Sequence, residues 1–388
     1  MYDFDTPIDR YAGYSQKWHK YPERNILPLW VADMDFITAP EIMASLEQTL
    51  QHGVFGYSIQ QNLVKNDVVT YLKHEYEWDV NTTDIIWLPG TVAGINLSCR
   101  ALIGANDAVI TATPIYPPFL SAPKLSERGL ITTELVNVKG IWQWDLADLE
   151  QKILQSPKKA RLLLLCNPHN PVGRVWTRDE LEQILELAVR YDLLICSDEI
   201  HCGLVLDSER KHIPFASLNA EASQRTVTLM APSKTYNVAG LNCAFVVASN
   251  SVLRTKFVNA MRGLFSEVNI FGIAACQAAL TKGHAWRSEL LDYLRLNRDL
   301  VVRELANVDG LKVTTPEATY LVWIDGRELC AKYSIANLQQ FFEAAGVGLS
   351  DGADYGSVGF VRLNFGTNRA ILNDALRLMR EAVEGLSK

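Results

Sequence analysis

The chain has 388 residues, of which 48% are hydrophobic and 21% are charged, and these proportions exclude the disordered and fibrous classes. The length predicts two domains, or one large domain with a smaller one. The formal net charge is −7 at pH 7, and the Lys and Arg residues are scattered. This argues against a nucleic-acid partner, because a nucleic-acid surface needs a basic patch.

The cysteine pattern and the N-terminus point to a protein of a reducing compartment. The seven cysteines are irregularly spaced within apolar strings, and no CxxC pair occurs. We therefore expect neither a disulfide framework nor a metal site. The start of the chain, MYDFDTPIDRY, lacks the pattern of a signal peptide, and no apolar run reaches the roughly 18–20 residues of a membrane span. These features favour a cytoplasmic protein without membrane contact.

The first two thirds of the chain read as an α/β unit. Residues 27–36 form a tight apolar segment, and Pro40 opens a helical pattern that Gly53 ends. A helix over 177–192 begins with a capping box. From about residue 85, such helices alternate with apolar runs of strand length: IIWLPG, DAVITATP, ARLLLLCNP, LLICSDEI, RTVTLMAPSK and CAFVVAS. This alternation predicts a mostly parallel sheet that helices cover on both faces.

The pattern changes after about residue 285. A long polar helix over 286–308 is followed by the strand-like KVTTPEATYLVWIDG, a helix near 335–345, FVRLNFG, and a last helix that runs to residue 388. This order predicts a smaller α+β unit. We expect a large α/β domain over 46–284, and a small domain formed by 285–388 together with 1–45.

Unusual polar groups follow the apolar runs of the predicted sheet. Asn170, Asp198 and Lys234 each follow one run, and the turn 89–94 leads from another run into a helix. Each has an ordinary explanation when taken alone: a lysine is often solvated, an aspartate often caps a helix, and NPHNPVG reads as a loop with Asx-Pro turns. Ligands bind at this edge of open α/β sheets, however.

Taken together, these groups suggest a pyridoxal phosphate site. The site needs an amine that forms a Schiff base, a carboxylate that keeps the ring nitrogen protonated, an amide donor, and free backbone amides for the phosphate. The motifs GxGxxG, GxxxxGK[ST], HExxH and GxSxG are absent from the sequence. Dinucleotide, P-loop, zinc-protease and serine-hydrolase interpretations are therefore disfavoured.

The same residues resemble a known family. Asn170-Pro171-x-Gly173, Asp198 and Ser233-Lys234 resemble the signature of fold-type I pyridoxal-phosphate enzymes, the aspartate aminotransferase superfamily. From about residue 27 to 369, longer strings resemble the MalY/PatB-type cystathionine beta-lyases, among them LPLWVADMDF, HGVFGYS, TATPIYPPF, CNPHNPVGRVW, SDEIHCGLVL, APSKTYNVAGL, PEATYLVWID and GFVRLNFG. The resemblance implies a large domain with a mostly parallel sheet and a smaller α+β domain.

The resemblance also implies roles around the cofactor. Lys234 matches the Schiff-base lysine, Asp198 the partner of the pyridine nitrogen, and Asn170 the donor to the 3-oxygen of the ring. Tyr116 matches the aromatic residue that stacks on the ring. The residues matching the remaining cofactor positions are Thr91 and Val92 at the phosphate, with Ser233 and His201 beside the cofactor.

Further matches concern the substrate and the oligomer. Arg362 matches the arginine that clamps the α-carboxylate of the substrate, a task suited to a bidentate guanidinium, and Ala32 belongs to the same substrate site. Tyr57 matches a tyrosine that reaches the phosphate of the neighbouring subunit. The resemblance therefore implies a homodimer with shared active sites.

Three positions depart from the superfamily aminotransferases and favour a lyase. His201 stands where they use Tyr, Asn242 where many place an Arg that binds phosphate, and Ala231 where they often place Ser. The implied reaction is β-elimination from cystathionine or a related cysteine S-conjugate, giving a thiol, pyruvate and ammonia, with Lys234 removing the Cα proton. Two alternatives stay open: an aminotransferase with the same site, and a cofactor-binding protein with a regulatory role.

Overall fold

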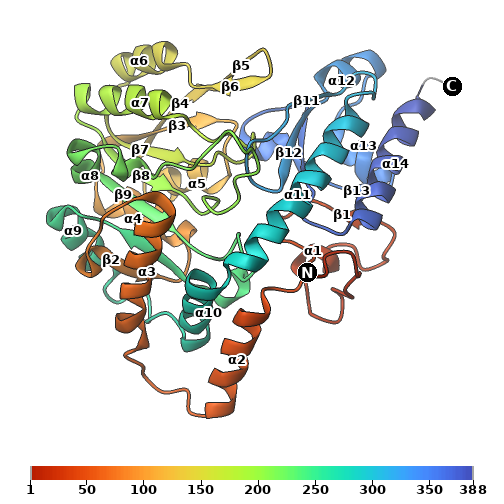
Figure 1. Cartoon of the computed structure of the whole chain (residues 1–388). Helices are drawn as coiled ribbons and strands as arrows, with labels where there is room; N and C mark the ends of the chain where they lie inside the picture. Colours follow the sequence, from red (N-terminus) through yellow and green to blue (C-terminus); the bar gives the residue numbers. More distant parts are fainter. Residues whose placement is uncertain (1, 387–388) are drawn as a thin grey trace.

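The computed structural model describes residues 2–386 and shows two lobes, each built around one main sheet (Figure 1). The larger sheet has the strand order β2-β10-β9-β8-β7-β3-β4. All neighbours pair in parallel except β10, which is antiparallel to β9 and β2. Its strands are β2 (Ile85–Leu88), β3 (Asp107–Thr113), β4 (Gly129–Glu134), β7 (Lys159–Cys166), β8 (Leu194–Asp198), β9 (Thr226–Met230) and β10 (Ala244–Val247). The predicted mostly parallel sheet is confirmed.

This sheet is buried on both faces, which explains its continuous apolar strands. Along β7, Leu162 and Leu164 enter one apolar core, whereas Leu163 and Leu165 enter another on the opposite face. The helices around the sheet are α4 (Thr91–Ala101), α5 (Pro118–Leu125), α6 (Leu146–Gln155), α7 (Arg178–Arg190), α8 (Ala220–Arg225) and α9 (Ser251–Met261). Since α4, α5 and α9 contribute to the first core and α6 and α7 to the second, helices cover both faces as predicted.

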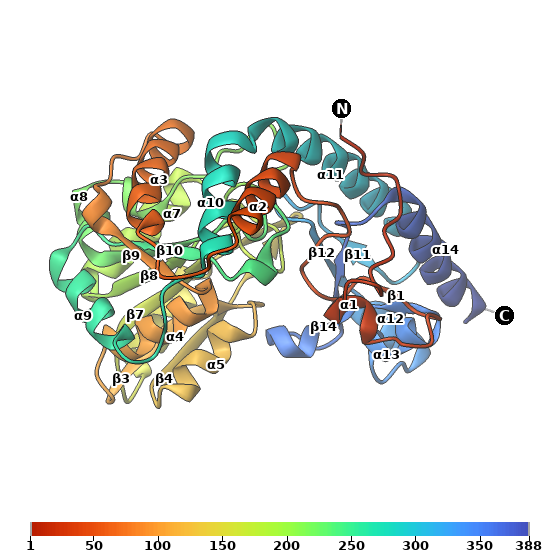
Figure 2. The same cartoon turned by 90° about the horizontal axis from the view of Figure 1, so that it is seen from below.

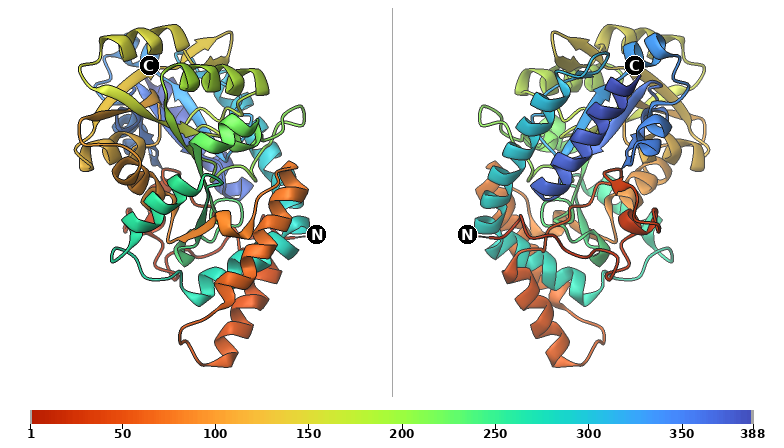
Figure 3. Two further views of the ribbon diagram at one scale, coloured as in Figure 1. Left: turned by 90° about the vertical axis from the view of Figure 1, so that its left-hand side faces the viewer. Right: turned by 90° about the vertical axis from the view of Figure 1, so that its right-hand side faces the viewer.

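Three further helices pack beside the larger sheet. They are α2 (Pro40–His52), α3 (Gln60–Tyr76) and α10 (Ile270–Lys282), and α10 contacts both of the others. The predicted end of α2 is correct, because Gly53 adopts a left-handed φ of 74° directly after it. The loop between α2 and α3 protrudes from the molecule (Figure 3).

The smaller sheet is antiparallel, with the order β11-β12-β15-β14. Its strands are β11 (Lys312–Val313), β12 (Leu321–Asp325), β14 (Ser350–Asp351) and β15 (Phe360–Asn364), and its helices are α11 (His284–Leu305), α12 (Arg327–Tyr333), α13 (Leu338–Ala344) and α14 (Arg369–Gly385). The helix expected near 335–345 is α13, and the pattern missed α12 before it. The last helix was expected to run to residue 388, but residues 387 and 388 lie outside the described residues.

The N-terminal segment packs on the smaller lobe (Figure 2). After α1 (Gln16–His19), β1 (Leu27–Pro28) pairs in parallel with β13 (Val347–Gly348), and Phe4 and Leu29 belong to the core of that lobe. The remaining short elements are β5 (Val136–Val138), β6 (Ile141–Gln143), η1 (Thr82–Asp84), η2 (Phe215–Ser217), η3 (Ala239–Leu241) and η4 (Gly352–Tyr355). Within residues 2–386, no helix has both the length and the apolar character to cross a membrane.

Candidate active site

A cavity of about 310 Å³ lies at the carboxyl edge of the larger sheet. The topology explains its position: the ends of β7 and β8 pair at Cys166 and Asp198, and the loop after β9 carries Lys234 to the same edge. The cavity brings together every predicted site residue except Tyr57, namely Ala32, Thr91, Val92, Tyr116, Asn170, Asp198, His201, Ser233, Lys234 and Arg362. The parallel sheet brings Asn170, Asp198 and Lys234 to one edge although they are far apart in the sequence. Arg362 comes from the smaller sheet and Ala32 from the N-terminal segment.

Lys234 faces the cavity and contacts the N-terminal segment. Its Nζ donates a hydrogen bond of 2.5 Å to the carbonyl oxygen of Ala32. Burial, together with the positive charge of Arg362, lowers the pKa of Lys234 to about 8, whereas Asp33 and Asp198 oppose the change. A far larger fraction of this amine than of an ordinary lysine is therefore neutral near pH 7, and a neutral amine is a nucleophile and a base.

Asp198 is buried at the end of β8. Its Oδ1 accepts a hydrogen bond of 3.2 Å from the backbone N–H of Ile200. Burial raises the pKa of Asp198 to about 7, although that hydrogen bond opposes the increase. A carboxylate in this position favours a cationic partner inside the cavity, because a nearby positive charge stabilises its ionised form.

Arg362 is a buried cation whose partners are neutral. It donates to Oδ1 of Asn170 at 3.0 Å and to the carbonyl oxygen of Trp30 at 2.8 Å, and its Nε is buried without a hydrogen-bond partner. The guanidinium lies 4.9 Å from the ring centroid of Tyr355. Since a buried charge needs compensation, this arginine is suited to bind an anionic ligand such as a carboxylate.

The start of α4 supplies a second place for an anion. Thr91 and Val92, the first two residues of α4, both line the cavity. The first N–H groups of a helix lack partners within the helix, and the helix dipole places partial positive charge there. The first turn of α4 carries no acidic residue, so this end of the cavity suits a phosphate group.

His201 lines the cavity as a neutral imidazole. Burial lowers its pKa to about 3, and the charges of Lys234 and Arg362 add to this effect. Its Nδ1 is buried without a hydrogen-bond partner, and its ring packs edge-on against Tyr320 at 6.2 Å. The ring can therefore donate or accept one hydrogen bond toward a ligand, and its role stays a prediction.

Sequence reasoning missed the residues that order the segment 30–36. Tyr320 donates to the carbonyl oxygen of Ala32 at 3.0 Å. Asn364 donates to the carbonyl oxygens of Val31 and Asp33 at 2.7 and 2.6 Å. The motifs PEATYLVWID and GFVRLNFG contain Tyr320 and Asn364, but only the fold shows that both side chains reach the N-terminal segment.

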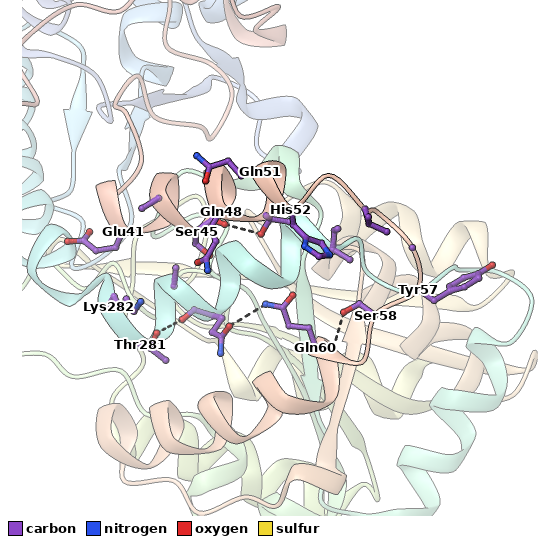
Figure 4. Close-up of a pocket in the computed structure, with 17 residues that line it drawn as sticks. Glu41, Ser45, Gln48, Gln51, His52, Tyr57, Ser58, Gln60, Thr281 and Lys282 are labelled. Carbon is purple, nitrogen blue, oxygen red and sulfur yellow. Dashed lines mark hydrogen bonds between the residues drawn. The ribbon is translucent and has the colours of Figure 1, made fainter.

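Tyr57 lies away from this cavity, on the loop between α2 and α3. Its side chain is fully exposed and points away from the helices (Figure 4). It lines a different and larger cavity, of about 1100 Å³, together with residues of α2 and α10 such as Ser45 and Gln277. The structure of one chain therefore does not join Tyr57 to the other predicted residues.

The fold and the location of this site define the class of fold-type I pyridoxal-phosphate transferases, which is the predicted fold class. The family "Aminotransferase class I and II" matches residues 24–378, and the chain belongs to this family. Among curated proteins, it is 35% identical to cystathionine beta-lyase PatB of Bacillus subtilis, over 98% of this chain and 100% of PatB. It is 30% identical to protein MalY of Escherichia coli over the full length of both.

Solved structures agree with this assignment. OvoB is 43% identical, with a TM-score of 0.95 and coverage of 98% of this chain and 99% of OvoB. Cystalysin from Treponema denticola, whose structure contains a pyridoxal 5'-phosphate cofactor, is 31% identical, with a TM-score of 0.92 over the full length of both chains. The predicted resemblance to the MalY/PatB-type lyases is confirmed.

Proposed function

We propose that this chain is a pyridoxal-phosphate-dependent carbon–sulfur lyase that acts on cysteine-derived amino acids by β-elimination. The observation that carries the proposal is the meeting of Lys234, Asp198 and Arg362 in one cavity. Relatives named cystathionine beta-lyase, such as PatB, match over nearly the full chain, and cystalysin contains the cofactor. Cystathionine or a related cysteine S-conjugate is the substrate class that these names support.

The residues present fit pyridoxal phosphate. The amide groups at the start of α4 suit its phosphate, Asp198 suits its ring nitrogen, and the amine of Lys234 suits its aldehyde. Asn170, Tyr116, Ser233 and His201 line the same cavity and would hold the ring. When bound, the cofactor supplies an electron-withdrawing ring that stabilises negative charge at the Cα atom of the substrate.

The chain itself supplies the orientation of the substrate and the movement of the proton. Arg362 binds the α-carboxylate through its guanidinium, which is already buried without a carboxylate partner in the described residues. Lys234 removes the Cα proton, a task that its pKa of about 8 favours. The C–S bond then breaks, and the sulfur leaves as a thiolate that can take a proton from Lys234. Water then hydrolyses the three-carbon product to pyruvate and ammonia.

We also propose that two copies share their active sites and that the protein is cytoplasmic. The α2–α3 loop exposes Val54, Phe55, Tyr57 and Ile59, and an exposed apolar group of this kind is typical of an interface. In a homodimer, Tyr57 would reach the phosphate of the other subunit. Six of the seven free cysteines are buried and Cys330 is partly buried, which supports a reducing compartment.

Replacement of Lys234 tests this function. Lys234→Ala is expected to lower pyruvate release from cystathionine by a factor of about 10²–10⁴, because the base and the anchoring amine are lost together. It should also abolish the visible absorbance of the lysine-bound cofactor. Lys124→Ala removes an exposed lysine and should leave both properties unchanged. Full turnover by Lys234→Ala would contradict the proposed function.

A substrate panel separates the lyase from an aminotransferase. The purified protein is incubated with cystathionine, cysteine and alkyl or aromatic cysteine conjugates, with and without a 2-oxo acid. A lyase releases pyruvate and ammonia without the 2-oxo acid, whereas an aminotransferase forms a new amino acid only in its presence. Product formation that depends strictly on the 2-oxo acid would show that the protein is an aminotransferase and not a lyase.

A further inference from the structure

A partly buried ionic cluster includes residues of the segment 30–36, whose Ala32 carbonyl accepts the hydrogen bond of Lys234. Arg10 and Lys17 come from the N-terminal arm, and Asp33 and Asp35 from the segment 30–36. Nζ of Lys17, which is completely buried, lies 2.7 Å from Oδ2 of Asp35 and 3.8 Å from Oδ1 of Asp33. Arg10 lies 3.0 Å from Oδ2 of Asp33 and 3.1 Å from Oδ1 of Asp35. The cluster therefore ties the N-terminal arm to this segment.

The two carboxylates of the cluster are not equivalent. Asp35 is buried and its oxygens accept hydrogen bonds from Lys17, Arg10 and Trp18, so it has the environment of a structural ion pair. Asp33 is 28% exposed, and its Oδ1 accepts no hydrogen bond although it is buried. Arg10 and Lys17 therefore compensate the negative charge of Asp33 less completely than that of Asp35.

Asp33 directly follows the residue that accepts the hydrogen bond of Lys234. The carbonyl oxygen of Ala32 accepts from Nζ of Lys234 and from the hydroxyl of Tyr320, and the carbonyl oxygen of Asp33 accepts from Asn364 and Lys17. Both neighbouring peptide groups are therefore fixed, and the acceptor for Lys234 is held in place by side chains from the arm and from the smaller sheet.

We infer that Asp33, anchored by Arg10 and Lys17, is a positioning residue for Lys234. The inference rests on the proposed function, in which Nζ of Lys234 takes the Cα proton of the substrate. That transfer converts a neutral amine into an ammonium ion, with the proton leaving Cα and its electron pair staying behind. The Ala32 carbonyl and the Asp33 carboxylate stabilise the new positive charge, because they are already in place when it forms.

The charges around Lys234 agree with this role. Asp198 at the end of β8 and Arg362 in β15 line the same cavity as Lys234. His201, which also lines it, is neutral at pH 7. Asp33 is the negative charge contributed by the N-terminal segment, and it raises the pKa of Lys234 against the effects of burial and of Arg362. Removal of the Asp33 charge should therefore make the ammonium form less stable.

The test uses Asp33→Asn, which keeps the shape and an acceptor for Arg10, and measures the cofactor-free protein. Only a neutral amine attacks an aldehyde, so the rate of pyridoxal phosphate incorporation follows the titration of Lys234. We expect the midpoint of this rate profile to move down by about half a pH unit or more. In the loaded enzyme, the deuterium isotope effect at Cα should increase, since proton removal becomes more difficult.

Two further variants separate positioning from folding. Asp9→Asn removes an exposed carboxylate from the same arm and should leave the profile unchanged, and Asp33→Glu keeps the charge and should return the midpoint toward that of the wild type. An unchanged midpoint in a folded Asp33→Asn protein overturns the inference. If the wild type fails to bind the cofactor through Lys234, as judged by borohydride reduction and peptide mass spectrometry, it is the proposed function that fails.

Discussion

Asp198 combines a structural cost with its proposed role at the cofactor. Its carboxyl group is buried at the end of β8, and burial raises its pKa to about 7. Ordinary aspartates have a pKa near 3.8, so over most of the interval between these values the folded cofactor-free protein binds a proton that the unfolded chain has released. A positive ring nitrogen in the cavity would offset this cost, because it stabilises the ionised carboxylate.

The pH dependence of stability tests this account. In the cofactor-free protein, the Asp198 contribution to the free energy of unfolding should fall as the pH rises from about 4 to 7, since the folded state binds the extra proton only below its raised pKa. In the variant Asp198→Asn, the amide that replaces the carboxyl group does not titrate. The stability of this variant relative to the wild type should therefore rise by about 2 kcal/mol or more between pH 5 and pH 8.

Denaturation in urea across this pH range measures the difference. Asp354→Asn, at an exposed carboxylate, should follow the wild type at every pH. The stabilised Asp198→Asn protein should nevertheless bind pyridoxal phosphate more weakly, because the partner of the ring nitrogen is lost. If the free energies of unfolding of Asp198→Asn and the wild type changed with pH in parallel, burial of the ionised carboxylate would not destabilise the folded protein.

The polar groups of the cavity were predictable where they follow a strand directly. Asn170, Asp198 and Lys234 stand after apolar runs, and the carboxyl ends of parallel strands must meet at one edge. Asp33 and Tyr320 were not predictable in this way. Tyr320 contacts Ala32, which lies 288 residues away along the chain. Asp33 pairs with Arg10 and Lys17 of the N-terminal arm, and no local pattern shows either set of contacts.

Helix α7 begins with a capping box that can be recognised in the sequence. Thr177 accepts a hydrogen bond from the backbone N–H of Glu180, and the Glu180 side chain accepts one from the backbone N–H of Thr177. Glu180 also pairs with Arg174, which lies 2.9 Å from Glu317 in the smaller lobe. The predicted capping box is confirmed, and it contacts an ion network between the lobes.

Removal of the cap should weaken the larger lobe. Thr177→Ala leaves the N–H of Glu180 without its side-chain acceptor, which should lower the free energy of unfolding by about 1 kcal/mol. Thr255→Ala, within the exposed part of α9, is the matched change, and it should be neutral or slightly stabilising because alanine is the best helix former. Both are measured by urea denaturation. Equal stability of the two variants would contradict a stabilising cap.

Sequence analysis misses strands whose hydrophobic pattern is weak, and it does not give the direction of a strand. The strand β4 (Gly129–Glu134) contains three partly buried residues and one exposed residue, so its sequence GLITTE lacks a continuous apolar run. The antiparallel direction of β10 depends on how the chain returns between β2 and β9. An apolar run such as CAFVVAS predicts a buried strand but carries no information about its direction.

At the scale of the whole molecule, the cavity depends on both lobes. The larger sheet supplies Asp198 and Lys234, the smaller sheet supplies Arg362, and the N-terminal segment supplies Ala32. A single chain leaves Tyr57 outside this arrangement, on a protruding loop (Figure 4). If two copies share their sites, each cavity is complete only when the loop of the partner is present.

Mixing two defective chains tests the shared site. Tyr57→Ala should weaken cofactor binding about tenfold or more, because a hydrogen bond to a charged group is lost, and Lys234→Ala should be inactive. In a mixed dimer, one cavity has Lys234 from one chain and Tyr57 from the other. At a cofactor concentration too low to load Tyr57→Ala, coexpression should therefore restore about a quarter of the wild-type activity, since half of the dimers are mixed and each has one native site.

A control variant and the mass of the particle in solution distinguish a shared active site from independent sites. Tyr14→Ala removes a similarly exposed tyrosine on the N-terminal arm, and it should bind the cofactor and turn over substrate as the wild type does. Light scattering after gel filtration should give twice the chain mass of 43.4 kDa. A monomeric particle with full activity would exclude the shared site. A dimer without complementation would place Tyr57 at an interface that leaves the cavity of each chain independent.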